Sequence, residues 1–179
     1  NSITIFLTQT SIMKSENLSQ YFEENKKSWN IRTEIHKTSE MYAMEEFQSG
    51  GTSLREIELN EIGDQVAGKT MLHLQCHFGQ DSISWGRMGA KVTAMDFSDM
   101  AIKLGQELAD KENFDVRFIC CNTYDLPEHL DEQYDIVFAS YGVIGWLPDM
   151  DKWAEIVARF VKPGGFFYFA EFHPVLWMM

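Results

Sequence analysis

KTMLHLQCHFGQD, residues 69–81, has the pattern of a strand, a loop and a helix in succession. An apolar run over 70–76 leads into a polar turn that contains Gly79, and a helical pattern follows over 80–88. This order is typical of the first unit of a nucleotide-binding α/β domain. Such loops usually carry several glycines, whereas here Gln75, Cys76 and His77 precede a single one. The loop therefore indicates a ligand that tolerates side chains along it.

Strands and helices continue to alternate beyond this unit. The sequence predicts further strands over 91–96, 116–121, 134–140 and 166–172, and helices over 99–111 and 151–161. The strands are almost continuously apolar, as is typical of strands that are covered on both faces by helices. Because the crossovers between parallel strands are right-handed, we predict a doubly wound, mostly parallel, Rossmann-like α/β sheet. Its expected strand order is 3-2-1-4-5.

The chain before residue 68 has a different pattern. Leu18, Phe22 and Trp29 are spaced among many charges, which predicts helices that pack on another body. We divide the chain into a start over residues 1–12 that is disordered or foreign to the domain, a helical lid over 13–67 and an α/β core over 68–179. Because HPVLWMM directly follows the fifth predicted strand, we expect the core to be truncated there.

Composition and charge exclude several classes of protein. The 179 residues are 45% hydrophobic and carry a net charge of −12, which favours a folded domain and disfavours a nucleic-acid partner. No apolar run is long enough to span a bilayer, so we expect no membrane partner. Three cysteines without repeated spacing are typical of reduced thiols. We therefore expect a cytoplasmic protein, and the sequence predicts no oligomeric state.

Ligands of a doubly wound sheet bind beyond the carboxyl ends of the strands. Asp96 ends the second predicted strand, where a carboxylate can accept two hydrogen bonds from a ribose diol or cap the next helix. Phe97 offers a flat face to a purine or belongs to the core. Asn122 and Thr123 follow the third strand, where they can pair with adenine or form a turn. These residues predict a nucleoside site.

The scarcity of glycine bears on which nucleoside is bound. A dinucleotide places its pyrophosphate against bare backbone at the helix start, and the side chains of Gln75 and His77 would crowd that approach. S-Adenosylmethionine carries a nucleoside but no phosphate, so it does not need this space. A NAD-type dehydrogenase is the enzymatic alternative. A non-catalytic nucleoside-binding or interaction module of the same fold is the other.

Four segments in succession carry a family resemblance. They are MLHLQCHFGQDSISWGRMGAKVTAMDFSDMAI, CCNTYDLP, YDIVFASYGVIGWLPD and VKPGGFFYFAEFHP. In order, spacing and strand placement they resemble the motifs of class I S-adenosylmethionine-dependent methyltransferases, over roughly residues 68–174. The resemblance implies methyl transfer to a small-molecule acceptor by in-line displacement. His73 stands where this family often has an acid.

The resemblance also implies roles for single residues. It places the methionine part of the cofactor in the loop 73–79, the ribose on Asp96, the adenine at Asn122 and Thr123, and the sulfonium near Ser140 and Tyr141. Within the loop, the implied contacts are His73, Gln75, His77 and Gly79.

Candidate bases follow the fourth and fifth predicted strands. Tyr141, Glu171 and His173 are placed to take a proton from an acceptor that is protonated at neutral pH. Packing or turn formation is the alternative for each of them. No residue is established as catalytic by the sequence.

Two further groups of residues can be weighed. His73, Cys76 and His77 resemble metal ligands, but side chains alternate across a strand end and no fourth ligand is apparent, so we predict no metal site. In the N-terminal segment, aromatic and cationic side chains can close over a ligand and exclude water. They are Trp29, Arg32, His36 and Tyr42.

Overall fold

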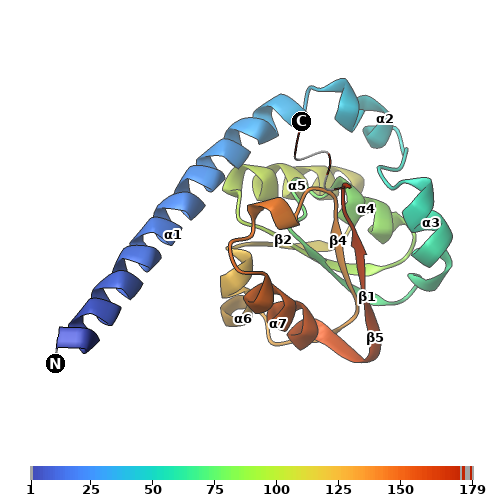
Figure 1. The fold of residues 1–179 in the computed structure, drawn as a ribbon. Helices are drawn as coiled ribbons and strands as arrows, with labels where there is room; N and C mark the ends of the chain where they lie inside the picture. The colour runs from blue at the N-terminus through green and yellow to red at the C-terminus, as the bar shows by residue number, and fades with distance from the viewer. Residues whose placement is uncertain (1, 174, 176–177, 179) are drawn as a thin grey trace.

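The computed structural model describes residues 2–173, 175 and 178, with side chains from Leu18 onward (Figure 1). In this part of the chain, five parallel strands form one sheet in the order β3-β2-β1-β4-β5. The strands are β1 (Thr70–Leu74), β2 (Lys91–Asp96), β3 (Val116–Cys120), β4 (Tyr134–Ser140) and β5 (Val161–Ala170). The predicted Rossmann-like fold class and strand order are confirmed.

Helices cover both faces of the sheet because its strands are apolar on both faces. One face packs against α3 (Glu56–Ile62), α4 (Gln80–Arg87) and α5 (Asp99–Glu112), and the other against α6 (Leu126–His129) and α7 (Met150–Phe160). Figure 1 shows α4 and α5 on the opposite side of the sheet from α6 and α7. Short 3₁₀ turns complete the connections: η2 (Gly63–Gln65), η3 (Thr123–Asp125) and η4 (Ile144–Trp146).

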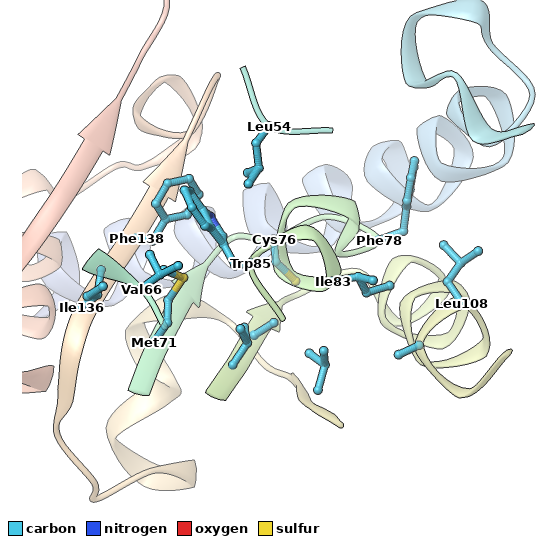
Figure 2. Close-up of a cluster of buried hydrophobic side chains, with 14 of the residues drawn as sticks. Leu54, Val66, Met71, Cys76, Phe78, Ile83, Trp85, Leu108, Ile136 and Phe138 are labelled. Atoms are coloured by element: carbon cyan, nitrogen blue, oxygen red, sulfur yellow. The ribbon is translucent and has the colours of Figure 1, made fainter. Parts of the chain in front are cut away.

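Alternation along each strand divides the core into two clusters. On β1, Met71 joins the cluster under α4 and α5, whereas Leu72 and Leu74 join the cluster under α7. Figure 2 shows the first cluster, in which the fully buried Trp85 of α4 lies beside Phe138 of β4. The two helical layers are thus anchored on opposite faces of the sheet.

Several element bounds differ from the sequence prediction. The first strand ends at Leu74 instead of residue 76, because Gln75 has a φ of 52° and leaves the extended conformation. The fifth strand begins at Val161 instead of residue 166, and its pairing with β4 is irregular between Tyr134 and Ile136. The turn signal KPGG therefore lies inside an edge strand, where proline is tolerated.

The N-terminal segment forms one long helix, α1 (Ser2–His36), followed by η1 (Glu40–Tyr42) and α2 (Met44–Gln48). The α1 helix crosses the carboxyl edge of the sheet. Asn30 and Ser98 share a hydrogen bond of 2.6 Å, and the Trp29 ring lies 5.3 Å from His77 and 5.4 Å from Trp146. This helix therefore forms a wall above the strand ends.

Length alone does not make α1 a membrane helix. Among the residues that the structure describes, no helix combines the length and the apolar character that a membrane crossing requires.

Candidate functional site

A cavity of about 550 Å³ lies at the carboxyl ends of β1, β2 and β4. This is the size of a small-molecule site and the place where doubly wound sheets bind ligands. It is closed on one side by the N-terminal segment. The predicted site residues that line it are Trp29, Arg32, Tyr42, His73, Gln75, His77, Gly79, Asp96, Phe97, Ser140 and Tyr141.

The loop after β1 adopts backbone conformations that usually require glycine, although most of its residues are not glycines. Gln75, His77 and Gly79 all have left-handed backbone conformations, with φ values of 52°, 52° and 72°. Glycine adopts this conformation without steric cost, whereas other residues pay for it. The Gln75 side chain accepts a hydrogen bond from Trp153 Nε1 at 3.3 Å, and the His77 ring packs on Phe78. Tertiary contacts therefore hold both side chains.

Asp96 lies buried at the end of β2 and faces the cavity. Its carboxylate accepts the backbone N–H groups of His77 and Ser98, each at 2.9 Å. Burial raises the pKa of Asp96 to about 6, although these backbone hydrogen bonds act in the opposite direction. The Ser98 hydroxyl caps α5 by accepting the Ala101 N–H. Ser98, and not Asp96, is therefore the side-chain cap of α5, so the interpretation of Asp96 as a helix cap does not hold.

Asn122 and Thr123 are not among the residues that line the cavity, and their predicted contact with adenine stays a prediction. The Asn122 side chain accepts the Tyr124 N–H at 3.1 Å and thereby caps η3. Thr123 is buried beside it. The turn alternative accounts for Asn122, because a short polar side chain after a strand satisfies the backbone that turns there.

The three candidate bases have different surroundings. His173 is exposed, lies outside the cavity and accepts the Val175 N–H at 3.3 Å. The Glu171 carboxylate accepts backbone N–H groups of the loop after β4, including that of Val143 at 2.8 Å. Tyr141 lines the cavity, and the Arg55 guanidinium lies 4.5 Å from its ring centre. Of these three residues, Tyr141 alone lines the cavity.

His73 is a buried, neutral residue on β1. Its Nδ1 atom lies 2.8 Å from the Ser82 hydroxyl, and its ring packs edge-on against Phe138. Burial lowers the pKa of His73 to about 3. Cys76, the second of the three residues that resemble metal ligands in the sequence, donates a hydrogen bond from its thiol to the His77 carbonyl. Within the described residues, no group of three His, Cys, Asp or Glu side chains is arranged to hold a metal ion.

Aromatic side chains of α1 and η1 pack over the loop. His36 stacks on Tyr42 at 4.7 Å and lies 5.1 Å from His77, although His36 itself does not line the cavity. Burial and, to a smaller extent, the neighbouring His36 lower the pKa of His77 to about 3. Trp29 and Tyr42 thus reach the cavity as the lid hypothesis requires.

Asp81, in the first turn of α4, is a cavity residue that the sequence analysis did not identify. Its carboxylate accepts the Ser53 hydroxyl at 2.6 Å and the Ser140 hydroxyl at 3.1 Å. In the sequence, the feature that could have identified Asp81 is its position two residues after Gly79 of the loop. Ser53 was not identified either, because only the fold brings residues 53, 81 and 140 together.

A parallel doubly wound sheet with a cavity at its switch point defines the class as a Rossmann-like ligand-binding domain. Over residues 72–169, more than half of the chain, the sequence matches the family model described as "Methyltransferase domain". The chain belongs to this family. The resemblance drawn from the sequence, to class I S-adenosylmethionine-dependent methyltransferases, is thereby confirmed.

Known proteins similar to this chain agree with the family. The ubiquinone biosynthesis O-methyltransferase of Shewanella pealeana is 32% identical over 125 residues, which cover 66% of this chain and 51% of that protein. The solved structure of DhpI with SAH has a TM-score of 0.63 and 20% identity, over 83% of this chain and 68% of that one.

A methyltransferase from Thiobacillus denitrificans, solved with S-adenosyl-L-homocysteine, has a TM-score of 0.53 and 19% identity. That match covers 69% of this chain and 53% of the other. At these identities the two solved structures establish the fold alone. The chain spans about half the length of the curated relatives that it matches.

Proposed function

We propose that this domain binds S-adenosylmethionine and transfers its methyl group to a small-molecule acceptor. The observation that carries the proposal is the Asp96 carboxylate, which faces the cavity beside the loop 75–79 while two backbone N–H groups hold it in place. A carboxylate has further lone pairs available after these two bonds. It can therefore accept the hydroxyl groups of a ribose.

The residues around the cavity fit such a cofactor. A nucleoside with an amino acid side chain needs a small-molecule-sized cavity, a fixed acceptor for the ribose and polar groups for the amino acid part. The cavity of about 550 Å³, Asp96 and the loop 75–79 supply these features. The side chains of Gln75 and His77 at the start of the loop disfavour a pyrophosphate, and hence a NAD-type dehydrogenase.

The chemistry asks little of the protein beyond positioning. S-Adenosylmethionine, when bound, supplies a methyl group on a sulfonium that leaves without protonation. Correct alignment of two reactants lowers a barrier by about 7–11 kcal/mol. Trp29 and Trp146 both line the cavity and pack edge-on against each other. Burial and the neighbouring Glu58 raise the pKa of Tyr141, and Tyr141 lines the cavity, where its side chain can contact an acceptor.

The lining also bears on the acceptor. Tyr141, Trp146 and Phe172 all line the cavity, and the ring centres of Tyr141 and Phe172 lie 5.3 Å apart. Flat aromatic walls favour a planar, aromatic acceptor, and the Shewanella pealeana relative is named for the ubiquinone pathway. We therefore propose a small aromatic acceptor. A cytoplasmic location stays a prediction.

Calorimetry with S-adenosylmethionine, S-adenosylhomocysteine and NAD tests the proposal. Both adenosine compounds should bind, and NAD should bind weakly or not at all. Asp96→Ala should weaken S-adenosylhomocysteine binding about ten- to hundredfold, the scale of a hydrogen bond to a charged group. Asp151→Ala, at an exposed position of α7, is the control and should bind normally.

Because Asp96 also holds the loop, each variant is first compared with the wild type by thermal melting. Asp96→Asn keeps acceptor oxygen for the backbone and removes the charge. It should lose affinity while melting closer to the wild type than Asp96→Ala. An unchanged dissociation constant in both variants, or tighter binding of NAD, would contradict the proposed function.

A further inference from the structure

Two arginines line the cavity of a protein whose net charge is −12. Arg32 belongs to α1, whereas Arg55 directly precedes α3, where its guanidinium covers the Tyr141 ring at 4.5 Å. Within the described residues, neither arginine forms an ion pair. The cavity therefore offers positive charge that no acidic side chain of the described chain neutralises by direct contact.

Aromatic rings hold the Arg32 guanidinium at the cavity. Its central carbon lies 5.7 Å from the ring centres of both Trp29 and Trp146, a distance at which the face of a ring attracts a cation. In the part of the chain that the structure describes, its one hydrogen bond is long, from Nε to the Ser28 hydroxyl at 3.5 Å. A guanidinium has five N–H donors, so most of those of Arg32 are left for a ligand.

The position of Arg32 separates it from the proposed ribose site. Asp96 ends β2, whereas Trp146 belongs to η4, which follows β4. In the sheet, β2 and β4 are the neighbours of β1 on opposite sides. The contact with Trp146 therefore places Arg32 toward the β4 side of the cavity, away from the strand that carries the ribose acceptor. Arg32 also lies outside residues 72–169, so the match to the family model assigns it no role.

We propose that Arg32 selects a methyl acceptor that carries a carboxylate, which it binds beside Trp29 and Trp146. This inference rests on the proposed function, because it names the substrate class of the same site. A guanidinium matches a carboxylate with two parallel hydrogen bonds. The aromatic rings around it favour a planar ring on the same molecule. The acceptor class is therefore an aromatic carboxylic acid.

Pairs of probes that differ in charge test the proposal. The protein is saturated with S-adenosylhomocysteine and titrated in a calorimeter, at neutral pH and low salt, with benzoate, 4-hydroxybenzoate and 3,4-dihydroxybenzoate, each compared with its amide. The amide keeps the shape but not the charge. At least one acid should bind about ten- to hundredfold more tightly than its amide, the scale of a hydrogen bond to a charged group. Because Arg32 is exposed, high salt should reduce this preference.

Variants of Arg32 assign the preference to one side chain. Arg32→Gln should abolish the preference for the acid, and Arg32→Lys should retain part of it, because lysine keeps the charge but not the planar fork. Both variants should bind S-adenosylhomocysteine within about twofold of the wild type. Lys27→Gln is the matched control, because it removes one positive charge from an exposed position of the same helix that does not line the cavity. It should leave the preference unchanged.

The outcomes distinguish this inference from the proposed function. If wild-type protein binds S-adenosylhomocysteine but binds no acid, or binds each acid no more tightly than its amide, the carboxylate class is wrong and the proposed function stands. An unchanged preference in Arg32→Gln removes Arg32 from the acceptor site. A loss of affinity for S-adenosylhomocysteine in Arg32→Gln also overturns the inference, because Arg32 would then bind the methyl donor. Wild-type protein that does not bind S-adenosylhomocysteine overturns the proposed function itself.

Discussion

Gly79 combines a left-handed backbone with a close contact to an aromatic ring. Its φ is 72°, and a Cβ atom at this position would lie 2.6 Å from the Phe118 side chain. Gly105 on α5 faces the same ring, with a Cβ distance of 2.9 Å. The two glycines therefore let the Phe118 side chain of β3 lie against α4 and α5. The absence of a side chain at Gly79 thus permits both the left-handed loop conformation and the packing of Phe118 against the helices.

Gly79→Ala should destabilise the fold by about 2–5 kcal/mol. The left-handed conformation costs about 1–2 kcal/mol for alanine, and overpacking against Phe118 adds about 1–3 kcal/mol. Gly68→Ala is the control, because Gly68 has a φ of 76° but open space around its Cβ position. It should lose only the conformational part. Urea denaturation measures both, and equal losses would show that the Phe118 contact is unimportant.

At the scale of elements, α1 is attached to the carboxyl edge of the sheet by polar and aromatic contacts. Lys26 pairs with Asp99 at 3.2 Å, and Asn30 contacts both Ser98 and Asp99. The contacts lie at the start of α5, which follows β2 and Asp96. The wall of the cavity and the proposed ribose site therefore depend on the same short stretch of backbone.

The lid role of α1 predicts that Trp29→Ala weakens S-adenosylhomocysteine binding. Trp29 packs against His77 of the loop and Trp146 of η4, and each aromatic pair contributes about 0.5–1.5 kcal/mol. The expected loss of affinity in calorimetry is about two- to tenfold. Ile31→Ala, at a position 62% exposed on the same helix, should bind normally. Unchanged binding by Trp29→Ala would remove α1 from the site.

At the scale of the whole molecule, buried ionisable groups tie stability to pH. His73 and His77 have pKa values lowered to about 3. Between about pH 6.5 and 3 the two histidine side chains bind protons in the unfolded chain but not in the folded chain. The free energy of unfolding therefore decreases as the pH is lowered through this range. Asp96 acts in the opposite direction, because its pKa of about 6 lets the folded state bind a proton first. The two larger histidine shifts outweigh it.

The free energy of unfolding should therefore be lower at pH 5 than at pH 7.5, as measured by urea denaturation. His77→Asn should show a smaller difference between the two pH values, because it removes one of the two titrating rings. Asparagine tolerates the left-handed conformation of this position, so the backbone is retained. If the variant loses as much stability as the wild type, His77 does not titrate as the structure implies.

The sheet was predictable because buried parallel strands require unbroken apolar runs, and such runs are visible in the sequence. Asp96 was predictable as a cavity residue because the carboxyl end of a strand has a fixed place in this fold. The adenine contact of Asn122 stays a prediction, since a short polar side chain after a strand caps a turn as readily as it meets a ligand, and Asn122 does cap η3. Asp81 was missed because its partners, Ser53 and Ser140, lie far away in sequence.

The sequence by itself determined the α/β class, the strand order and the edge of the sheet at which the cavity lies. It did so because hydrophobic periodicity and crossover handedness are local or generic properties of a chain. The tertiary structure alone decided that Gln75 and His77 adopt glycine-like backbone conformations, that His73 is neutral and that Asp81 faces the cavity with Ser53 and Ser140 as its partners. These properties depend on packing and burial between distant segments, which a linear pattern does not contain.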